Sequence, residues 1–212
     1  MSVIHNVYNF LSLPFRKNRM SKFLHTFEIT DKTTILDVGG TLFNWQLLDC
    51  PARITLLNIS PLDLSSNLPA NCNYVQGDGT DLRFDSKSFD IVFSNSVIEH
   101  LYSFENQLKF ASEVERVGKA LWIQTPARSF FFEPHFLTPF FHFLPKNARL
   151  KLARNFTFWG WITRPSTEYI RKVIEEINLL TFQQFQSLFP DCIIQKERFL
   201  GIFTKSYIVV RK

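Results

Sequence analysis

The sequence lacks the features that define disulfide-rich, membrane-spanning and secreted proteins. Its three cysteines, Cys50, Cys72 and Cys192, are far apart and odd in number, so we expect neither a disulfide framework nor a zinc site of the CxxC type. No run of about 18 apolar residues occurs, so no membrane span is indicated. The N-terminal segment carries its positive charges after its apolar part, which is the reverse of a secretory signal. We therefore expect a protein of the reducing cytoplasm.

The length and composition favour one globular domain. The chain has 212 residues, close to the usual domain size of about 100–200 residues, so we predict a single domain over residues 1–212. The 24 basic and 19 acidic residues give a net charge of +5, too small an excess to indicate a nucleic-acid partner. A hydrophobic fraction of 45% allows a sizeable core, and phenylalanine is unusually abundant, with 24 residues.

Residues 1–32 are predicted to form a helical cover for the domain. Four apolar residues fall at helical spacing, Ile4, Val7, Tyr8 and Leu11. We expect the helix to end before Pro14, because proline interrupts the helical hydrogen bonds. The favoured interpretation is that this helix covers the edge of the domain. The alternative is a weak peripheral membrane contact through the basic residues that follow, Arg16, Lys17, Arg19 and Lys22.

From residue 33 onward, short apolar runs alternate with helical patterns, which is typical of a doubly wound α/β sheet. The predicted strands cover residues 34–38, 54–59, 73–75, 89–94 and 120–124, and two closing strands cover 192–197 and 206–210. Helices are predicted at residues 105–117, 167–177 and 182–188. Gly118 stands where a C-cap glycine belongs, and Thr181 suits an N-cap.

The segment TILDVGGT at residues 34–41 predicts a ligand-binding turn. It is a strand that ends in an acid and two glycines before a helical pattern, and glycine allows backbone N–H groups to approach a ligand closely. No Gly-Lys-Ser/Thr follows, which excludes a Walker loop, and the third glycine of a dinucleotide fingerprint is missing.

Further pieces follow this turn in a characteristic order: ITLLNIS, VQGDGTDLRF, SFDIVFSNSVIEHL, then a helix and a strand that ends in QTP. Over residues 33–124 the chain resembles the class I S-adenosylmethionine-dependent methyltransferases, particularly the small-molecule type 11 branch. The resemblance implies a Rossmann-like, seven-stranded, mostly parallel sheet and S-adenosylmethionine as cofactor. It also implies methyl transfer to a small-molecule acceptor or to one linked to a lipid or glycan.

The resemblance further implies roles for individual residues around the cofactor. Those assigned to its methionine part are Asp37, Gly39, Gly40 and Thr41; those beside the adenine are Asp78, Gly79 and Thr80; and those near the sulfonium are Asn95 and Ser96. Asn58 stands where the family usually has an acid for the ribose hydroxyls, and an amide lacks the charge assistance of a carboxylate. This change and the loss of one glycine leave a second interpretation, a non-catalytic methyltransferase-like binding module. RNA methylation ranks third, because SNSV follows the fourth strand in place of a base-methylating motif.

Two acid–histidine pairs are the candidates for chemistry, Glu99 with His100 and Glu133 with His135. Histidine transfers protons near neutral pH, and a carboxylate beside it can orient it. We predict His100, Glu99 and His135 as catalytic residues. The same ligand types suit a divalent metal, but their spacing is not diagnostic, so no metal is assigned and the question stays open.

Residues 127–165 are predicted to be an insertion or lid after the fifth strand, helical and rich in phenylalanine. Seven of its phenylalanines gather in residues 130–145: Phe130, Phe131, Phe132, Phe136, Phe140, Phe141 and Phe143. They form either an apolar acceptor pocket or a cover that fills core, and both need apolar residues. The basic segment 146–172 that follows is either a solvated face or a source of cations, such as Arg154 or Arg164, for an anionic acceptor.

Overall fold

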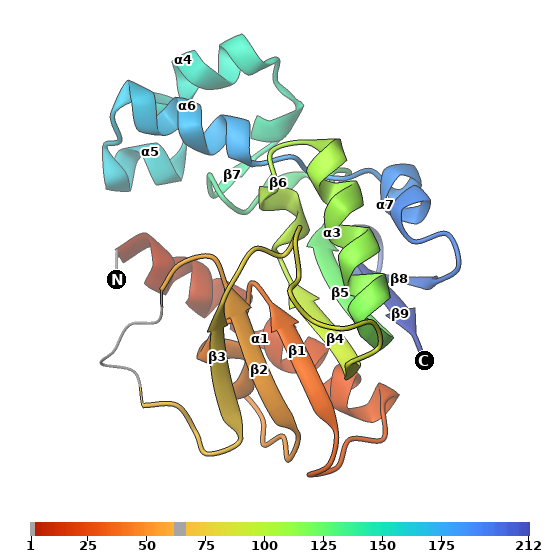
Figure 1. The fold of residues 1–212 in the computed structure, drawn as a ribbon. Coiled ribbons are helices and arrows are strands. Elements are labelled where there is room, and N and C mark those ends of the chain that lie inside the picture. The colour runs from red at the N-terminus through yellow and green to blue at the C-terminus, as the bar shows by residue number, and fades with distance from the viewer. Residues whose placement is uncertain (1–2, 62–66) are drawn as a thin grey trace.

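The computed structural model describes residues 3–61 and 67–212 and contains a seven-stranded sheet (Figure 1). The strand order is β3-β2-β1-β4-β5-β9-β8. The strands are β1 (Thr34–Val38), β2 (Arg53–Asn58), β3 (Cys72–Gln76), β4 (Phe89–Asn95), β5 (Gly118–Pro126), β8 (Ile193–Phe199) and β9 (Phe203–Arg211). The first five strands are parallel, and β9 lies antiparallel between β5 and β8. The predicted fold class and all seven predicted strands are confirmed.

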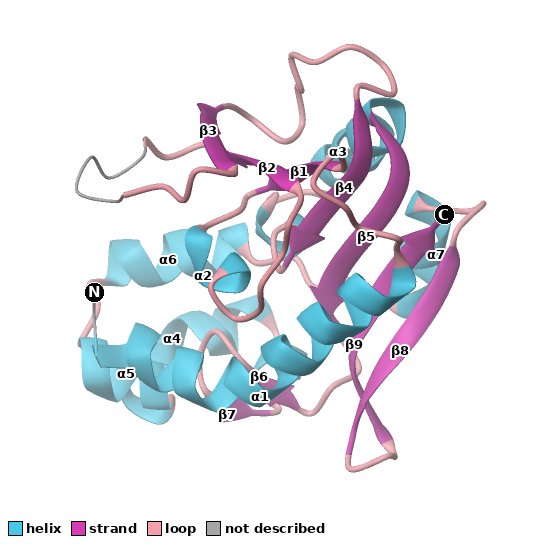
Figure 2. Cartoon of the chain, turned by 90° about the horizontal axis from the view of Figure 1, so that it is seen from below, coloured by secondary structure: helices cyan, strands magenta, loops and turns pink. Residues whose placement is uncertain are grey.

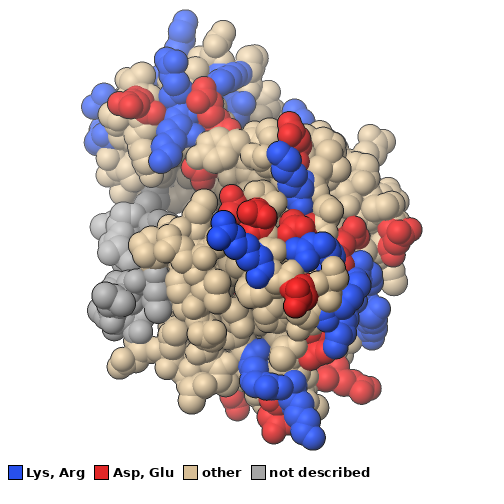
Figure 3. All heavy atoms as spheres, viewed as in Figure 1, with Lys and Arg blue, Asp and Glu red and all other residues tan. Residues whose placement is uncertain are grey.

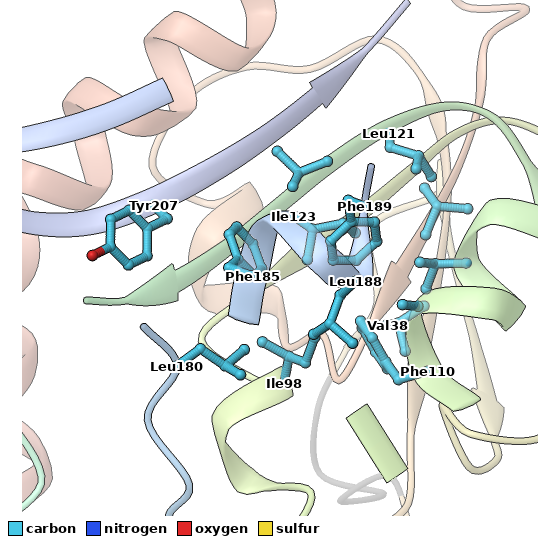
Figure 4. Packing of buried hydrophobic residues seen from close by; sticks show 14 of the residues in the cluster. Val38, Ile98, Phe110, Leu121, Ile123, Leu180, Phe185, Leu188, Phe189 and Tyr207 are labelled. Carbon is cyan, nitrogen blue, oxygen red and sulfur yellow. The ribbon is translucent and has the colours of Figure 1, made fainter. Parts of the chain in front are cut away.

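Helices cover both faces of this sheet. On one face, α3 (Phe104–Val117) and α7 (Phe182–Leu188) pack through Phe110, Phe185 and Phe189 against the sheet (Figure 4). On the other face, α1 (Val3–Thr26) and the short α2 (Leu42–Trp45) pack against Phe93 and Trp122 (Figure 2). Because both faces are buried, the central strands are apolar without alternation.

Helix α1 is longer than predicted, because it runs through Pro14 to Thr26. The second half of the helix buries Met20 and Phe23 completely, and the Phe23 ring contacts Phe93 and Trp122 edge-on at 5.0 and 5.6 Å. Burial of this size offsets the hydrogen bond that proline removes. The predicted apolar face of Ile4, Val7, Tyr8 and Leu11 lies outside the described side chains.

The predicted insertion at residues 127–165 is helical only in its second half, because the phenylalanine-rich residues 130–143 form no α-helix. These residues form two short paired strands, β6 (Phe132–Glu133) and β7 (Thr138–Pro139), and a 3-10 turn at Phe141–Phe143. Three helices follow: α4 (Lys146–Phe156), α5 (Phe158–Thr163) and α6 (Thr167–Glu176). These helices pack with Phe136 and Phe141 around a separate small core. We name the unit of residues 130–176 the lid; it includes α6 and so extends beyond residue 165.

Gly118 does not act as a left-handed helix cap, because its φ is −93° and it begins β5. A Cβ at this position would come within 2.7 Å of the Val92 side chain. The glycine therefore permits close packing of α3 on β4, whereas the predicted N-cap Thr181 is confirmed by its capping box. No helix within the described residues is long and apolar enough to cross a membrane.

Candidate active site at the carboxyl ends of the strands

A cavity of about 440 Å³ lies between the carboxyl ends of β1 and β4 and the lid. Its sheet side consists of Gly39, Thr41, Asn95 and Ser96, and its lid side includes His135, Trp159 and Glu176. His100 and Arg16 also line it. We call it the polar cavity. Open α/β sheets bind ligands at this edge, and six of the predicted site residues meet there: Gly39, Thr41, Asn95, Ser96, His100 and His135.

The loop after β1 requires glycine at one position. Gly39 has a φ of +75°, its N–H donates to Leu57 O at 2.7 Å, and a Cβ there would collide with the Val97 side chain. A side chain is therefore excluded by both the backbone conformation and the packing. Gly40 covers the Asp37 carboxyl group so closely that a Cβ would overlap it.

Asp37 lies beneath this loop and does not line the polar cavity. Its side chain is 1% exposed, and Trp45 Nε1 donates to its Oδ2 at 2.8 Å. Burial raises the pKa of Asp37 to about 8, although the hydrogen bond from Trp45 opposes this rise. In this arrangement Asp37 supports the loop from below, and Gly40 lies above its carboxyl group.

Asn58 explains one departure from the family pattern. Its Nδ2 donates to the carbonyls of Gly39 and Gly40, both at 3.3 Å, and its Oδ1 accepts from the N–H of Ser60 at 3.1 Å. A carboxylate has no proton to donate to these carbonyls. The amide at this position therefore holds the loop after β1 in place.

The three residues expected beside an adenine lie outside the polar cavity. Asp78 is exposed, and its Oδ1 accepts from both the N–H and the hydroxyl of Thr80 at 2.8 Å. Gly79 stands close to Val38 and Phe110, where a Cβ would come within 2.8 Å of a methyl group. These residues form a closed turn after β3.

Two histidines from distant parts of the chain face each other. His100, in the 3-10 turn after β4, and His135, between β6 and β7, have their Nε2 atoms 3.2 Å apart. His100 Nδ1 lies 3.0 Å from Glu176 Oε1, and His135 Nδ1 lies 2.6 Å from Glu133 Oε1. The resemblance and the spacing in sequence missed Glu176, because it comes from α6, 76 residues further on.

The expected pairing of Glu99 with His100 is wrong, since Glu176 is the carboxylate that binds His100. Glu99 is fully buried, and its Oε2 accepts from the Thr125 hydroxyl at 3.0 Å. Its Oε1 has no hydrogen-bond partner among the described residues. Neighbouring residues turn their side chains in different directions, so Glu99 points into the protein while His100 reaches the cavity.

Glu133 is buried behind His135, which itself lines the polar cavity. Burial alone would raise the pKa of Glu133 and lower that of His135. The attraction between the two outweighs it, so the pKa of Glu133 is lowered and the pKa of His135 is raised. Glu133 therefore stays ionised beside His135, as an orienting carboxylate requires.

A second cavity of about 330 Å³ adjoins the first and is mostly apolar. The two share Arg16, Ser96, Pro134 and Leu137. Its wall contains Phe15, Phe130, Phe131, Phe132 and Phe199; we call it the aromatic cavity. Thus the phenylalanines of the lid divide between both expected roles, because Phe130–Phe132 line this cavity and Phe136 and Phe141 fill core.

Arg19 is a structural residue, which contradicts its expected role in a membrane contact. It is 5% exposed and donates to Glu197 at 2.8 Å, to Gln124 at 3.0 Å and to Asn95. A buried arginine with three acceptors fixes the position of the helix that carries it. Arg19 therefore joins α1 to β4, β5 and β8 below the aromatic cavity.

Lys205 is the cation that the sequence did not reveal. Its Nζ lies 3.2 Å from the centroid of the Phe15 ring, and it lines the aromatic cavity. Burial lowers its pKa to about 8, although Glu197 opposes this shift. The predicted cations Arg154 and Arg164 are exposed and line neither cavity. In the view of Figure 3, basic and acidic side chains are interspersed on the lid surface.

In this sheet the C-terminal strand β9 runs antiparallel between β5 and β8, and a cavity lies at the carboxyl ends of β1 and β4. This arrangement is that of a class I methyltransferase fold. Residues 36–120 match the family described as "Methyltransferase domain". Over these residues the chain is therefore similar to the class I S-adenosylmethionine-dependent methyltransferases. No curated protein matches the chain.

Solved structures support the same fold at low sequence identity. One is a candidate sarcosine dimethylglycine methyltransferase from Galdieria sulphuraria, with 18% identity, a TM-score of 0.55, and 88% of this chain and 62% of that one covered. Another is phosphoethanolamine N-methyltransferase 2 of Haemonchus contortus, solved with S-adenosyl-L-methionine, with 16% identity, a TM-score of 0.54, and coverage of 84% and 38%. A third is YcgJ of Bacillus subtilis, with 14% identity and a TM-score of 0.53. The match covers 85% of this chain and 70% of that one. The chain therefore spans less than two thirds of the first two structures.

Proposed function

We propose that this protein transfers a methyl group from S-adenosylmethionine to a small acceptor that combines an apolar body with an anionic group. The observation that carries the proposal is the junction of two cavities at Ser96, at the carboxyl end of β4. One cavity lies on the glycine turn of the methyltransferase domain, and the other is aromatic. A transferase that joins two reactants needs such a junction, because catalysis depends on holding them in contact.

The residues of the polar cavity suit the cofactor. Gly39 brings the backbone of the loop to the cavity wall, and Asn95 and Ser96 supply hydrogen-bonding groups at the end of β4. The guanidinium of Arg16 at the same wall complements a carboxylate such as that of the methionine part. When bound, the cofactor supplies an electrophilic methyl group, and the protein positions the acceptor against it.

The acceptor class follows from the aromatic cavity. Phe130, Phe131 and Phe199 favour a ring or an acyl chain, whereas Lys205 and Arg16 favour a carboxylate or a phosphate. Attachment of the acceptor to a lipid or glycan remains a prediction, as does the cytoplasmic location. The facing imidazoles of His100 and His135 are the groups that we assign to the acceptor's polar atom.

Calorimetry with S-adenosylhomocysteine tests the proposal. We expect binding in the micromolar range and, with S-adenosylmethionine present, formation of S-adenosylhomocysteine when aromatic and acyl carboxylates or phosphates are supplied. The competing function is a binding module without catalysis. Absence of binding for both cofactor forms at millimolar concentration would favour the module and reject the enzyme.

A further inference from the structure

Glu99, His100 and His135 bring three ligand atoms within 4.8 Å of one another, the two histidines at the wall of the polar cavity and Glu99 buried behind them. If His100 and His135 each donate Nδ1–H to their carboxylates, Glu176 and Glu133, their Nε2 lone pairs face each other at 3.2 Å. Two lone pairs at that distance repel. The third group is the Glu99 carboxylate, whose Oε1 is buried and has no partner among the described residues. A cation between the three groups satisfies all of them at once.

We propose that Glu99, His100 and His135 bind a divalent transition-metal ion. Their ligand atoms all lie within 4.8 Å of one another. Two imidazole nitrogens and one carboxylate oxygen form a donor set that suits zinc, iron(II), cobalt(II) or manganese(II) and leaves coordination positions open.

The distance between the two nitrogens fits this assignment. Ligands at about 2.0–2.1 Å from an ion are about 3.3 Å apart in a tetrahedral site and about 2.9 Å apart in an octahedral one. The observed separation of 3.2 Å lies between these values. The carboxylate of Glu99 offers an oxygen within 4.8 Å of the histidine ligand atoms, so it reaches the ion after a shift of its side chain or through a water molecule, since metal–oxygen bonds are about 2.0–2.2 Å.

The surroundings are those of a metal site. Histidines that bind metals usually donate their second ring N–H to a carboxylate, which fixes the tautomer and the orientation of the ring. Glu176 and Glu133 occupy these positions. Glu133 is 1% exposed and Glu99 is fully buried, so a divalent ion also offsets buried negative charge.

The location gives the ion a use, and this part of the inference rests on the proposed function. His100 and His135 line the polar cavity beside Asn95 and Ser96. An open coordination position faces the place where cofactor and acceptor meet, so an oxygen of the acceptor can bind the ion there. When the ion binds both Nε2 atoms, the imidazoles no longer contact the acceptor's polar atom, and the ion polarises that atom instead.

A shared proton is the competing explanation for the short nitrogen–nitrogen distance. A protonated His135 could donate Nε2–H to His100 and thereby remove the repulsion. This arrangement leaves Glu99 Oε1 without a partner, whereas a metal ion does not. The two explanations differ in whether zinc binds and in what happens when Glu99 is changed.

The test uses the full chain after treatment with a chelator, titrated with Zn²⁺ by calorimetry and with Co²⁺ by visible absorption. We expect one ion per chain with micromolar or tighter affinity. His100→Gln, His135→Gln and Glu99→Gln should weaken it at least 100-fold. Glu133→Gln, which removes only an orienting group, should weaken it about 10–100-fold. The matched control is His25→Gln, because His25 is exposed and bonds to the backbone of Ser21.

A second measurement does not depend on the variants. Of the five histidines, only two should change their imidazole NMR signals when zinc is added to the wild-type chain. No binding of either ion at about 1 mM, or equal binding by the His135→Gln variant, would overturn the metal site. Calorimetry with S-adenosylhomocysteine in the same samples separates the two proposals. Cofactor binding without metal rejects only the metal site, and metal binding without cofactor rejects only the methyltransferase function.

Discussion

The two sides of the site differ in how fully their polar groups are paired. On the β1–β3 side, Asp37, Asn58 and Asp78 each have hydrogen-bond partners in the loops and the short helix that follow these strands. On the β4–lid side, Oε1 of Glu99 has no hydrogen-bond partner among the described residues, and two imidazoles face each other. Unpaired buried groups cost stability, so a protein keeps them where a ligand completes them. We therefore regard the β1–β3 side as a rigid platform, and we expect ligands to complete the polar groups on the β4–lid side.

The largest expected effect is on the pH dependence of stability, through the buried carboxyl group of Asp37. In the folded protein the pKa of Asp37 is raised to about 8, so the protein holds a proton there that the unfolded chain has lost. The stability from this proton is complete below about pH 4 and is lost as the pH rises to about 8, by at most about 1.4 kcal/mol per pH unit. Asp37→Asn should remove this slope. Urea unfolding from pH 5 to 8 measures it, and parallel curves for both proteins would contradict the burial of Asp37.

A side chain at Gly39 should be the next most damaging change. Gly39→Val forces a branched residue into a φ of +75° and against Val97. We expect at least a 100-fold loss of S-adenosylhomocysteine affinity by calorimetry. The matched control is Gly201→Val, because Gly201 has a φ of +71° but nothing within 4 Å of its Cβ position. Equal losses in both variants would trace the effect to backbone strain alone.

Asn58→Asp separates two functions of this residue. The family pattern implies that a restored carboxylate binds the ribose more tightly, whereas the structure shows an amide that donates to two loop carbonyls. We expect the aspartate to weaken cofactor binding about 10-fold and to cost about 1–3 kcal/mol of stability, since it repels those carbonyls. Calorimetry and thermal melting measure both effects. Tighter binding would assign Asn58 to the ribose.

The smallest expected effect concerns Lys205 in the aromatic cavity. Its ammonium is charged below its pKa of about 8, so the affinity for an aromatic carboxylate such as naphthoate should fall as the pH rises above that value. Lys205→Gln should weaken binding about 10-fold at pH 7 and abolish this pH dependence. Fluorescence titration follows the probe. Lys196→Gln is the control, because Lys196 also lies over a phenylalanine ring but is exposed.

The fold could be predicted from sequence because its signals are local. Runs such as residues 34–38 and 89–94 are apolar enough to define buried strands, and Thr181 carries a complete N-cap signature. The predicted end of the first helix before Pro14 was wrong, because local propensity takes no account of tertiary packing. Phe23, nine residues after Pro14, is buried against Phe93 and holds the helix in place. The predicted helical character of the whole insertion was also wrong, since the helices of the lid begin only after the phenylalanine-rich segment.

The site was most predictable where residues end a strand or follow it closely. Asn95 ends β4, Ser96 and His100 come shortly after it, and the parallel sheet brings them to one edge. Glu176 and Lys205 reach the site from α6 and β9, and no spacing in the sequence reveals that approach. The orientation of Glu99 is equally hidden, because it depends on Thr125 in the neighbouring strand.

The Arg19 cluster determines the order in which the site can be assembled. Arg19 and Glu197 are separated by 178 positions in sequence, and the aromatic cavity also needs Phe199 and Lys205. Contacts of such long range form late in folding. A chain that ends before residue 193 lacks β8 and β9, and with them Phe199 and Lys205, so it cannot close the aromatic cavity. The part of the site that we assign to the acceptor is therefore completed only when the last two strands join the sheet.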